Sequence, residues 1–308
     1  MKKALSVLLA LVLVVCVAPL REFSAGALQS GDYTYYLSGT APNQVAVIQK
    51  YTGLSATVVV PDTLGGCPVK HITDEAFRGC TSITALTLPP ALITVGLNAF
   101  RGCTGLTGIA FPPTATTIGD NAFYGCTGLL SVDFGTGIKK IGNDAFSKCT
   151  GLTEITLPDN VTSIGTNVFN GCTGLYRVII GDGLATVNTQ AFYDCTGITS
   201  VTIGKSVTLI SLTAFKNCTG LQEIIVHPEN TAYSTIDNGC VLYNKEKTVL
   251  KQYLVNKTAA FAIPAGVTEI GTKAFENWTR LTGITMPAGL SLIGVSAFAG
   301  CTGLTQAP

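Results

Sequence analysis

Apolar residues recur along most of this chain at an interval of 23 positions. A series of seven phenylalanines, from Phe77 to Phe215, follows this interval, and the series resumes at Phe275 and Phe298. A cysteine stands three residues after each of the first seven phenylalanines. A strict repeat of this length is typical of a solenoid, in which each unit buries its apolar face only against its neighbours.

The unit at 152–174 shows the elements that the repeat predicts. Inward Ile155 and Leu157 alternate with outward Glu154 and Thr156, which predicts a short strand that the following proline ends. A second short extended piece follows, and the residues after it have room for about one helical turn. Stacked units align equivalent strands about 4.8 Å apart. The predicted fold is therefore a β-rich solenoid with a parallel sheet of short strands and short helical turns.

Two segments break the period and define the predicted domain boundaries. Residues 28–53 contain two β-prone runs, which we interpret as a capping hairpin over the first coil. The interval between the seventh and eighth phenylalanines is longer than one period, and 227–263 is predicted to form a hairpin insert. The repeats then occupy 54–226 and 264–308, and the last coil is expected to be uncapped.

The first 27 residues have the features of a secretory signal peptide. Two lysines precede the apolar run at 4–17, and small residues at 25–27 offer a cleavage site. The run is shorter than the roughly 20 residues that span a bilayer as a helix. We expect a secreted or cell-surface bacterial protein with no membrane span after cleavage; an uncleaved interfacial anchor is the alternative.

The repeat unit resembles the BspA-like leucine-rich repeats over roughly residues 54–308. That family's unit runs L-xx-I-x-L-P, then V-xx-I-G and A-F-xx-C. The matching residues of one unit are Leu152, Ile155, Leu157, Pro158, Ile164, Gly165, Phe169 and Cys172. The resemblance implies a curved solenoid on the bacterial surface that adheres to host or matrix proteins, with no catalytic residue set in the repeats. Trp278 departs from the pattern, because it stands where the unit's cysteine is expected.

Composition argues against several classes of function. Lys plus Arg number 19 and Asp plus Glu 18, so the net charge of +1 predicts no nucleic-acid partner. The chain has two His, and one Cys per unit without a C-xx-C pair, so we expect no metal and no cofactor. Equivalent thiols on stacked coils lie too far apart for disulfides, so we expect buried, reduced cysteines. Whether Cys67 and Cys240 pair stays open.

The outward strand positions form the predicted binding surface. Most of them are small, neutral and rich in Thr, whereas the bulky or charged ones cluster in the central units. The candidate binding residues are Asp133, Glu154, Tyr176, Arg177, Ile179, Glu223 and Ile225. Because Tyr and Arg dominate the binding energy of interfaces, the predicted function is the recognition of proteins or other macromolecules at the cell surface.

Two other functions remain as alternatives. In the first, the repeats are a structural spacer without a ligand of their own. In the second, the chain is a secreted hydrolase in which Asp133 and Glu154 act as an acid/base pair. Two carboxylates on an open sheet face stay solvated and lack the burial that raises one pKa. We therefore expect no enzymatic activity.

Overall fold

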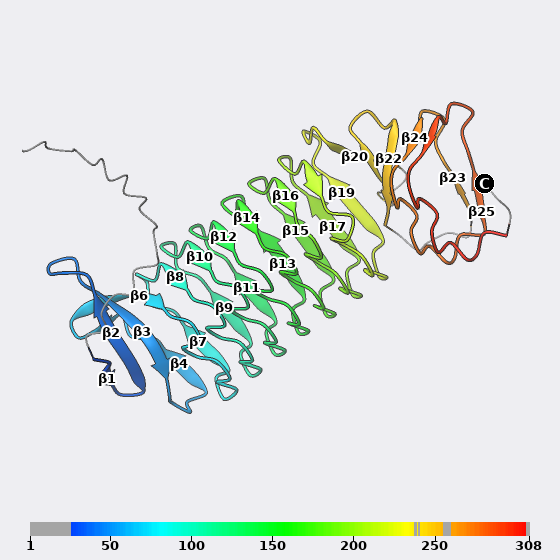
Figure 1. The fold of residues 1–308 in the computed structure, drawn as a ribbon. Helices are drawn as coiled ribbons and strands as arrows, with labels where there is room; N and C mark the ends of the chain where they lie inside the picture. Colours follow the sequence, from blue (N-terminus) through cyan, green and yellow to red (C-terminus); the bar gives the residue numbers. More distant parts are fainter. Residues whose placement is uncertain (1–25, 237–238, 240, 255–259, 306–308) are drawn as a thin grey trace, which may run out of the picture.

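The computed structural model describes residues 26–236, 239, 241–254 and 260–305. These residues form one elongated stack of coils, which runs from the hairpin near residue 30 to the last coil near residue 300 (Figure 1). The predicted signal peptide at 1–27 lies almost wholly outside the described residues, and so does Cys240. The prediction of a parallel β solenoid is confirmed.

Each regular coil contributes one strand to each of two rows of parallel strands, which we call the long-strand and short-strand sheets, and backbone pairing divides each row into several hydrogen-bonded segments along the stack. The long-strand sheet contains β4 (Thr57–Val59), β7 (Ala85–Thr87), β9 (Gly108–Ala110), β11 (Ser131–Asp133), β13 (Glu154–Leu157), β15 (Arg177–Ile180), β17 (Ser200–Ile203) and β19 (Glu223–Val226), and after the insert β23 (Ala260–Ala262) and β25 (Gly283–Thr285). The short-strand sheet contains β8 (Thr94–Val95), β10 (Thr117–Ile118), β12 (Lys140–Ile141), β14 (Ser163–Ile164), β16 (Thr186–Val187) and β18 (Leu209–Ile210), then β24 (Glu269–Ile270) and β26 (Leu292–Ile293). Paired residues stand 23 apart along the regular coils, as in Glu154 opposite Arg177.

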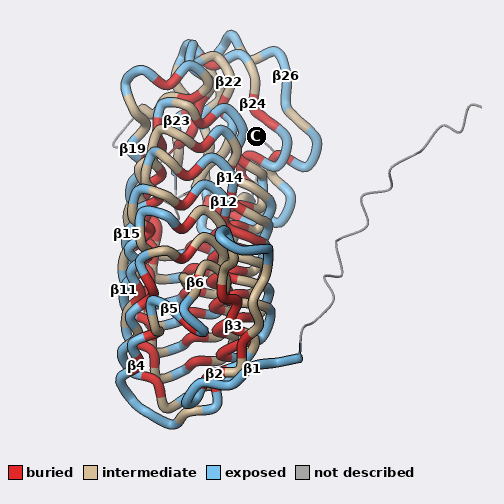
Figure 2. The backbone as a smooth tube through the Cα atoms, turned by 90° about the vertical axis from the view of Figure 1, so that its left-hand side faces the viewer, coloured by how far each residue is buried: buried red, intermediate tan, exposed pale blue. Residues whose placement is uncertain are grey.

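The interior of the stack is filled by identical side chains lying on one another. The rings from Phe77 to Phe215 stack in sequence, with centroid separations between 4.9 Å (Phe77–Phe100) and 5.5 Å (Phe146–Phe169). Buried residues line the inside of every coil and exposed ones the outside (Figure 2). The strand register therefore follows from the repeat, because a shift by one residue would unstack every ring.

The turns that follow the short strands are not helical, and that part of the prediction was wrong. Among the described residues there is no helix. Asn167 has a φ of 55°, a left-handed conformation that interrupts a right-handed helix. The N–H of Phe169 donates to the carbonyl of Ala191 in the next coil at 2.8 Å, instead of bonding within its own coil. The turns thus form a third ladder of backbone hydrogen bonds along the stack.

A second left-handed position lies just before the cysteine of each coil. Glycine occupies it in five coils, at Gly79, Gly102, Gly125, Gly171 and Gly300. Lys148 adopts the same conformation with a φ of 61°. A left-handed backbone costs a residue with a Cβ about 1–2 kcal/mol, and glycine avoids that cost.

We therefore predict that Lys148→Gly stabilises the fold by about 1 kcal/mol. Lys148→Ala is the matched control, since it removes the same long side chain but keeps the Cβ and its strain. Urea unfolding followed by circular dichroism measures both variants. Equal stability of the two variants would contradict the assignment of strain to this position.

At the N-terminal end, three antiparallel strands lie against the first coils, one strand more than the predicted hairpin. They are β1 (Leu28–Ser30), β2 (Tyr33–Ser38) and β3 (Val45–Tyr51), and β3 then pairs in parallel with β6 (Cys67–Ile72). The short strand β5 (Thr63–Leu64) pairs with β6. Tyr51 stacks on Phe77 at 5.1 Å, so a tyrosine ring begins the aromatic column.

The insert between the two runs of repeats has three antiparallel strands, one more than a hairpin. They are β20 (Tyr233–Ile236), β21 (Val241–Asn244) and β22 (Val249–Tyr253). Strand β22 pairs in parallel with β24, so the insert is part of the short-strand sheet. The buried core is divided here into two clusters, and Tyr253 packs against both.

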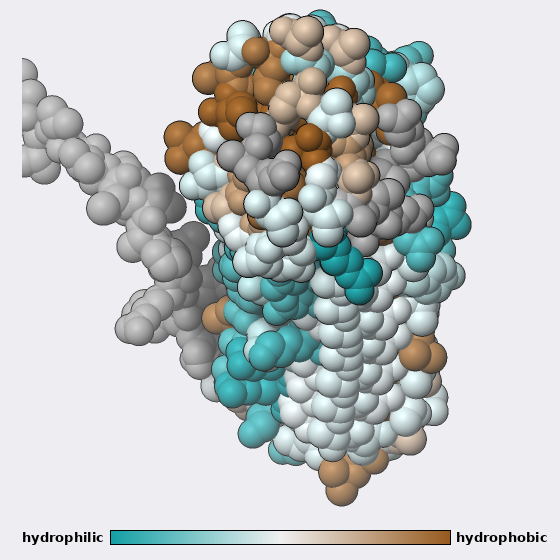
Figure 3. Space-filling model, turned by 90° about the vertical axis from the view of Figure 1, so that its right-hand side faces the viewer, coloured by the Kyte–Doolittle hydropathy of each residue, from teal (hydrophilic) through white to brown (hydrophobic). Residues whose placement is uncertain are grey.

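The last coil exposes residues whose equivalents are buried elsewhere. Ile293 is exposed, although Ile270 at the same repeat position is fully buried. Leu292 and Val295 are exposed beside it. Figure 3 accordingly shows hydrophobic side chains gathered over the final coils, whereas most of the other visible coils are neutral or hydrophilic.

Candidate binding surface

Five of the candidate binding residues lie in two adjacent rows of the long-strand sheet. The first row holds Glu154, Arg177 and Glu223, with Ser200 between the last two. The second row holds Thr156, Ile179, Thr202 and Ile225 in register. Because β13, β15, β17 and β19 pair in sequence order (Figure 1), these side chains share one outer face, which we call the central patch.

The central patch combines exposed apolar and charged groups. Tyr176 directly precedes Arg177, and we count it with the central patch. It is 49% exposed, and Ile225 is 46% exposed. The guanidinium of Arg177 lies 3.7 Å from the carboxylate of Glu154, and both side chains are substantially exposed. A solvated ion pair of this kind contributes about 0–1 kcal/mol. Arg177 is therefore free to exchange Glu154 for an acceptor on another molecule at little cost.

Asp133 is not part of the paired strands that carry the central patch. It lies on β11, which pairs with β9, and its carboxylate accepts the backbone N–H of Gly135 at 2.9 Å. Glu154 is instead held by Arg177. The two carboxylates of the hydrolase alternative thus have separate partners, and the one at 133 serves the turn at the end of its strand.

Sequence reasoning missed Leu130, which is 50% exposed just before β11. Its repeat position is threonine at Thr107, Thr153 and Thr199, where each hydroxyl donates to a carbonyl of the preceding coil. Leu130, Tyr176 and Gln222 replace this threonine, and Leu130 and Tyr176 are the apolar or aromatic ones. The signal was present in the sequence, because these positions depart from the threonine of the other coils.

The cysteines have a structural use that explains why they recur. Seven thiols donate to the phenylalanine carbonyl of the coil before, at 3.0–3.2 Å, from Cys103, Cys126, Cys149, Cys172, Cys195, Cys218 and Cys301. Burial raises the pKa of Cys149, Cys172 and Cys218 well above the ordinary thiol value. A thiol that stays protonated is a poor nucleophile and a poor metal ligand.

No metal-binding cluster of three His, Cys, Asp or Glu side chains occurs in the part of the chain that the structure describes. Cys67 is a partly buried free thiol. Its pairing with Cys240 stays open, because residue 240 lies outside the described residues. Within the described ranges, no helix has the length and hydrophobicity needed to cross a bilayer.

The model of the BspA type leucine rich repeat region matches residues 70–180, 139–250 and 253–307, in six copies. This chain belongs to that family. The resemblance found in the repeat unit is confirmed, and the BspA-type repeats extend across the insert into the last coils.

Solved structures show the same fold around the BspA-type repeats. A leucine rich cell surface protein of Faecalibacterium prausnitzii is 29% identical, with a TM-score of 0.70 over 92% of this chain and 82% of that one. The T. pallidum leucine rich repeat protein is 29% identical, with a TM-score of 0.58 over 64% of this chain and 91% of that one. The pneumococcal vaccine antigen PcpA shares the fold at 20% identity, with a TM-score of 0.61 over 91% and 69% of the two chains. A search of curated proteins finds no match.

Proposed function

We propose that this BspA-type chain is an exported bacterial surface protein that binds proteins or other macromolecules through the central patch, without catalysis. The observation that carries the proposal is the exposure of Tyr176 and Ile225 near the ion pair of Arg177 and Glu154, on a row of strands whose other outward residues are mostly small and neutral. Tyr and Arg are the residues most enriched among those that dominate interface energies. The similarity to a bacterial cell surface protein supports the location.

The patch offers a partner two kinds of contact. Tyr176, Ile179 and Ile225 can bury apolar area, while Arg177 can pair with a carboxylate in place of Glu154. Glu223 adds a second exposed carboxylate to the row of Arg177. A protein partner with an apolar segment, an acidic side chain for Arg177 and a basic side chain for Glu223 matches this arrangement.

We predict that a triple variant, Tyr176→Ala with Arg177→Ala and Ile179→Ala, loses about 2 kcal/mol of binding free energy or more. Immobilised collagen, fibronectin and laminin serve as the test panel, and surface plasmon resonance measures binding of the full chain. The matched control is Lys140→Ala with Ser163→Ala and Leu209→Ala, which removes cationic, small and apolar groups from the short-strand sheet. Unaltered binding by the triple variant would show that the central patch does not bind these proteins.

The alternatives give different results in the same system. If the repeats are a spacer, neither the unaltered chain nor the triple variant binds the immobilised proteins. Removing whole coils then changes only the length of the protein. A hydrolase releases product from polysaccharide or peptide substrates and loses turnover in Asp133→Asn or Glu154→Gln. The separate partners of these two carboxylates argue against the second outcome.

A further inference from the structure

A cavity lies where the insert interrupts the regular stack of coils. Phe215 stacks on Phe192 at 5.2 Å, but the next phenylalanine of the pattern, Phe275, stacks on Tyr253 at 5.5 Å. Between the turn that contains Phe215 and the turn that contains Phe275 there is a space of about 150 Å³, with 252–254 also at its wall. We call this space the junction cavity.

One wall of the junction cavity carries backbone donors that other coils use for stacking. The N–H of Phe192 donates to the carbonyl of Ala214 at 2.8 Å, and that of Asp194 donates to the next coil at 3.0 Å. The equivalent N–H groups of Phe215 and Asn217 have no backbone acceptor among the described residues. Because the N–H groups at these positions donate to the following coil elsewhere in the stack, we infer that those of Phe215 and Asn217 face the cavity, which both residues line.

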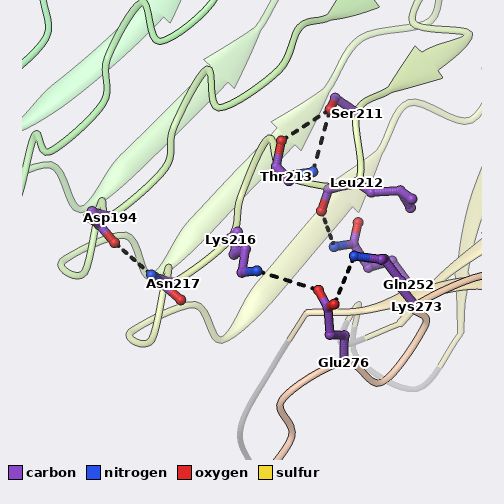
Figure 4. A network of polar contacts seen from close by, with 9 residues as sticks. All are labelled: Asp194, Ser211, Leu212, Thr213, Lys216, Asn217, Gln252, Lys273 and Glu276. Atoms are coloured by element: carbon purple, nitrogen blue, oxygen red, sulfur yellow. Dashed lines mark hydrogen bonds and ion pairs between the residues drawn. The ribbon is translucent and has the colours of Figure 1, made fainter. Parts of the chain in front are cut away.

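The charged groups of the cavity add a surplus of positive charge. Lys216 and Lys273 both contact the carboxylate of Glu276, at 3.5 and 2.9 Å, and Figure 4 shows these contacts from the two facing turns. The hydrogen bond from Lys273 lowers the pKa of Glu276, so this carboxyl is ionised at neutral pH. Gln252 uses its amide to donate to the Leu212 carbonyl. Two ammonium groups against one carboxylate favour an anion.

The rest of the wall is apolar and aromatic. Leu212 is partly exposed there, and the rings of Tyr253 and Trp278 stack at 4.0 Å beside it. Leu254 extends the same wall. A ligand with a charged head and an apolar body would therefore meet complementary groups at both ends.

We propose that the junction cavity binds a carboxylate attached to a small apolar or aromatic group. The carboxylate oxygens accept hydrogen bonds from the N–H groups of Phe215 and Asn217, as the carbonyls of a further coil would. Lys216 supplies the countercharge, and the apolar body lies against Leu212 and Tyr253. The carboxylate can belong to a free small molecule or to the C-terminus of a peptide.

The test uses Trp278, the single tryptophan of the chain, as an internal reporter at the cavity. Sodium benzoate is titrated into the full chain at constant ionic strength, and tryptophan fluorescence is recorded. Benzamide, which is neutral and of similar shape, is the ligand control. We expect a saturable change with benzoate and at least fivefold weaker binding of benzamide. A short peptide ending in phenylalanine, with a free or an amidated C-terminus, tests the second source.

Variants locate the binding. Lys216→Met should weaken the acid ligand at least fivefold, whereas Lys205→Met, which removes an ammonium paired with Asp182 on another coil, should leave it unchanged. Glu276→Gln should strengthen it, and this variant keeps the test valid if Lys216→Met fails to fold. Saturation by the acid peptide alone would assign the carboxylate to a partner protein. Absence of saturation by either acid, or equal binding of the neutral ligands, would overturn the proposal.

Discussion

Phe146→Ala is expected to destabilise the chain by about 4 kcal/mol, within the range for deletion of a fully buried phenylalanine side chain. The Phe146 ring has no exposed surface and stacks between Phe123 at 5.1 Å and Phe169 at 5.5 Å. The ring of Phe134 lies perpendicular to it, with the two centroids 5.7 Å apart. The coils above and below are held by the strand ladders, so they cannot collapse into the space that the ring leaves.

Phe298→Ala is the control for this prediction. Phe298 holds the same repeat position in the last coil, but it is partly exposed and stacks on one ring, Phe275, at 5.0 Å. Its loss should cost about 1–2 kcal/mol, because less surface returns to water. Urea unfolding followed by circular dichroism compares the two variants. Equal losses would show that stacking from both sides contributes nothing.

The repeat predicts the architecture because each coil buries its apolar side chains against the equivalent side chains of the next coil. A phenylalanine every 23 residues can be buried on both faces only if equivalent positions lie on top of one another. That condition sets the parallel register and the inward row of cysteines. It leaves the shape of the turns open, since Asn167 has a left-handed backbone that an apolar pattern does not encode.

The central patch was predicted residue by residue, but its internal pairing was not. Paired residues stand 23 positions apart, which places Glu154 opposite Arg177. The interval from Asp133 to Glu154 is two residues short of this period. Applying the register to the charged positions would have given the observed ion pair. The junction cavity could not be predicted in this way, because the insert follows no period and gives no register against the coils on either side.

Gly174, two residues after Cys172, allows neighbouring coils to pack closely. Its replacement is expected to give the second large loss of stability. A Cβ at Gly174 would lie 2.3 Å from the Thr150 carbonyl oxygen of the coil before, and the Gly174 N–H donates to that same oxygen at 3.1 Å. Because the obstacle is backbone, no rotamer change can relieve the contact. The two coils must move apart, which strains the packed core and breaks the hydrogen bond.

We therefore expect Gly174→Ala to cost about 3 kcal/mol, from overpacking together with a lost hydrogen bond. The chain offers its own control at Arg280, which holds this repeat position in the coil that follows the insert, where no regular coil precedes it. Arg280→Ala should change stability by less than about 0.5 kcal/mol. Urea unfolding measures both variants, and a loss below about 1 kcal/mol for Gly174→Ala would mean that the stack yields at this contact. In that case, a side chain at this repeat position, such as Arg280, would indicate only that the coils can move apart locally.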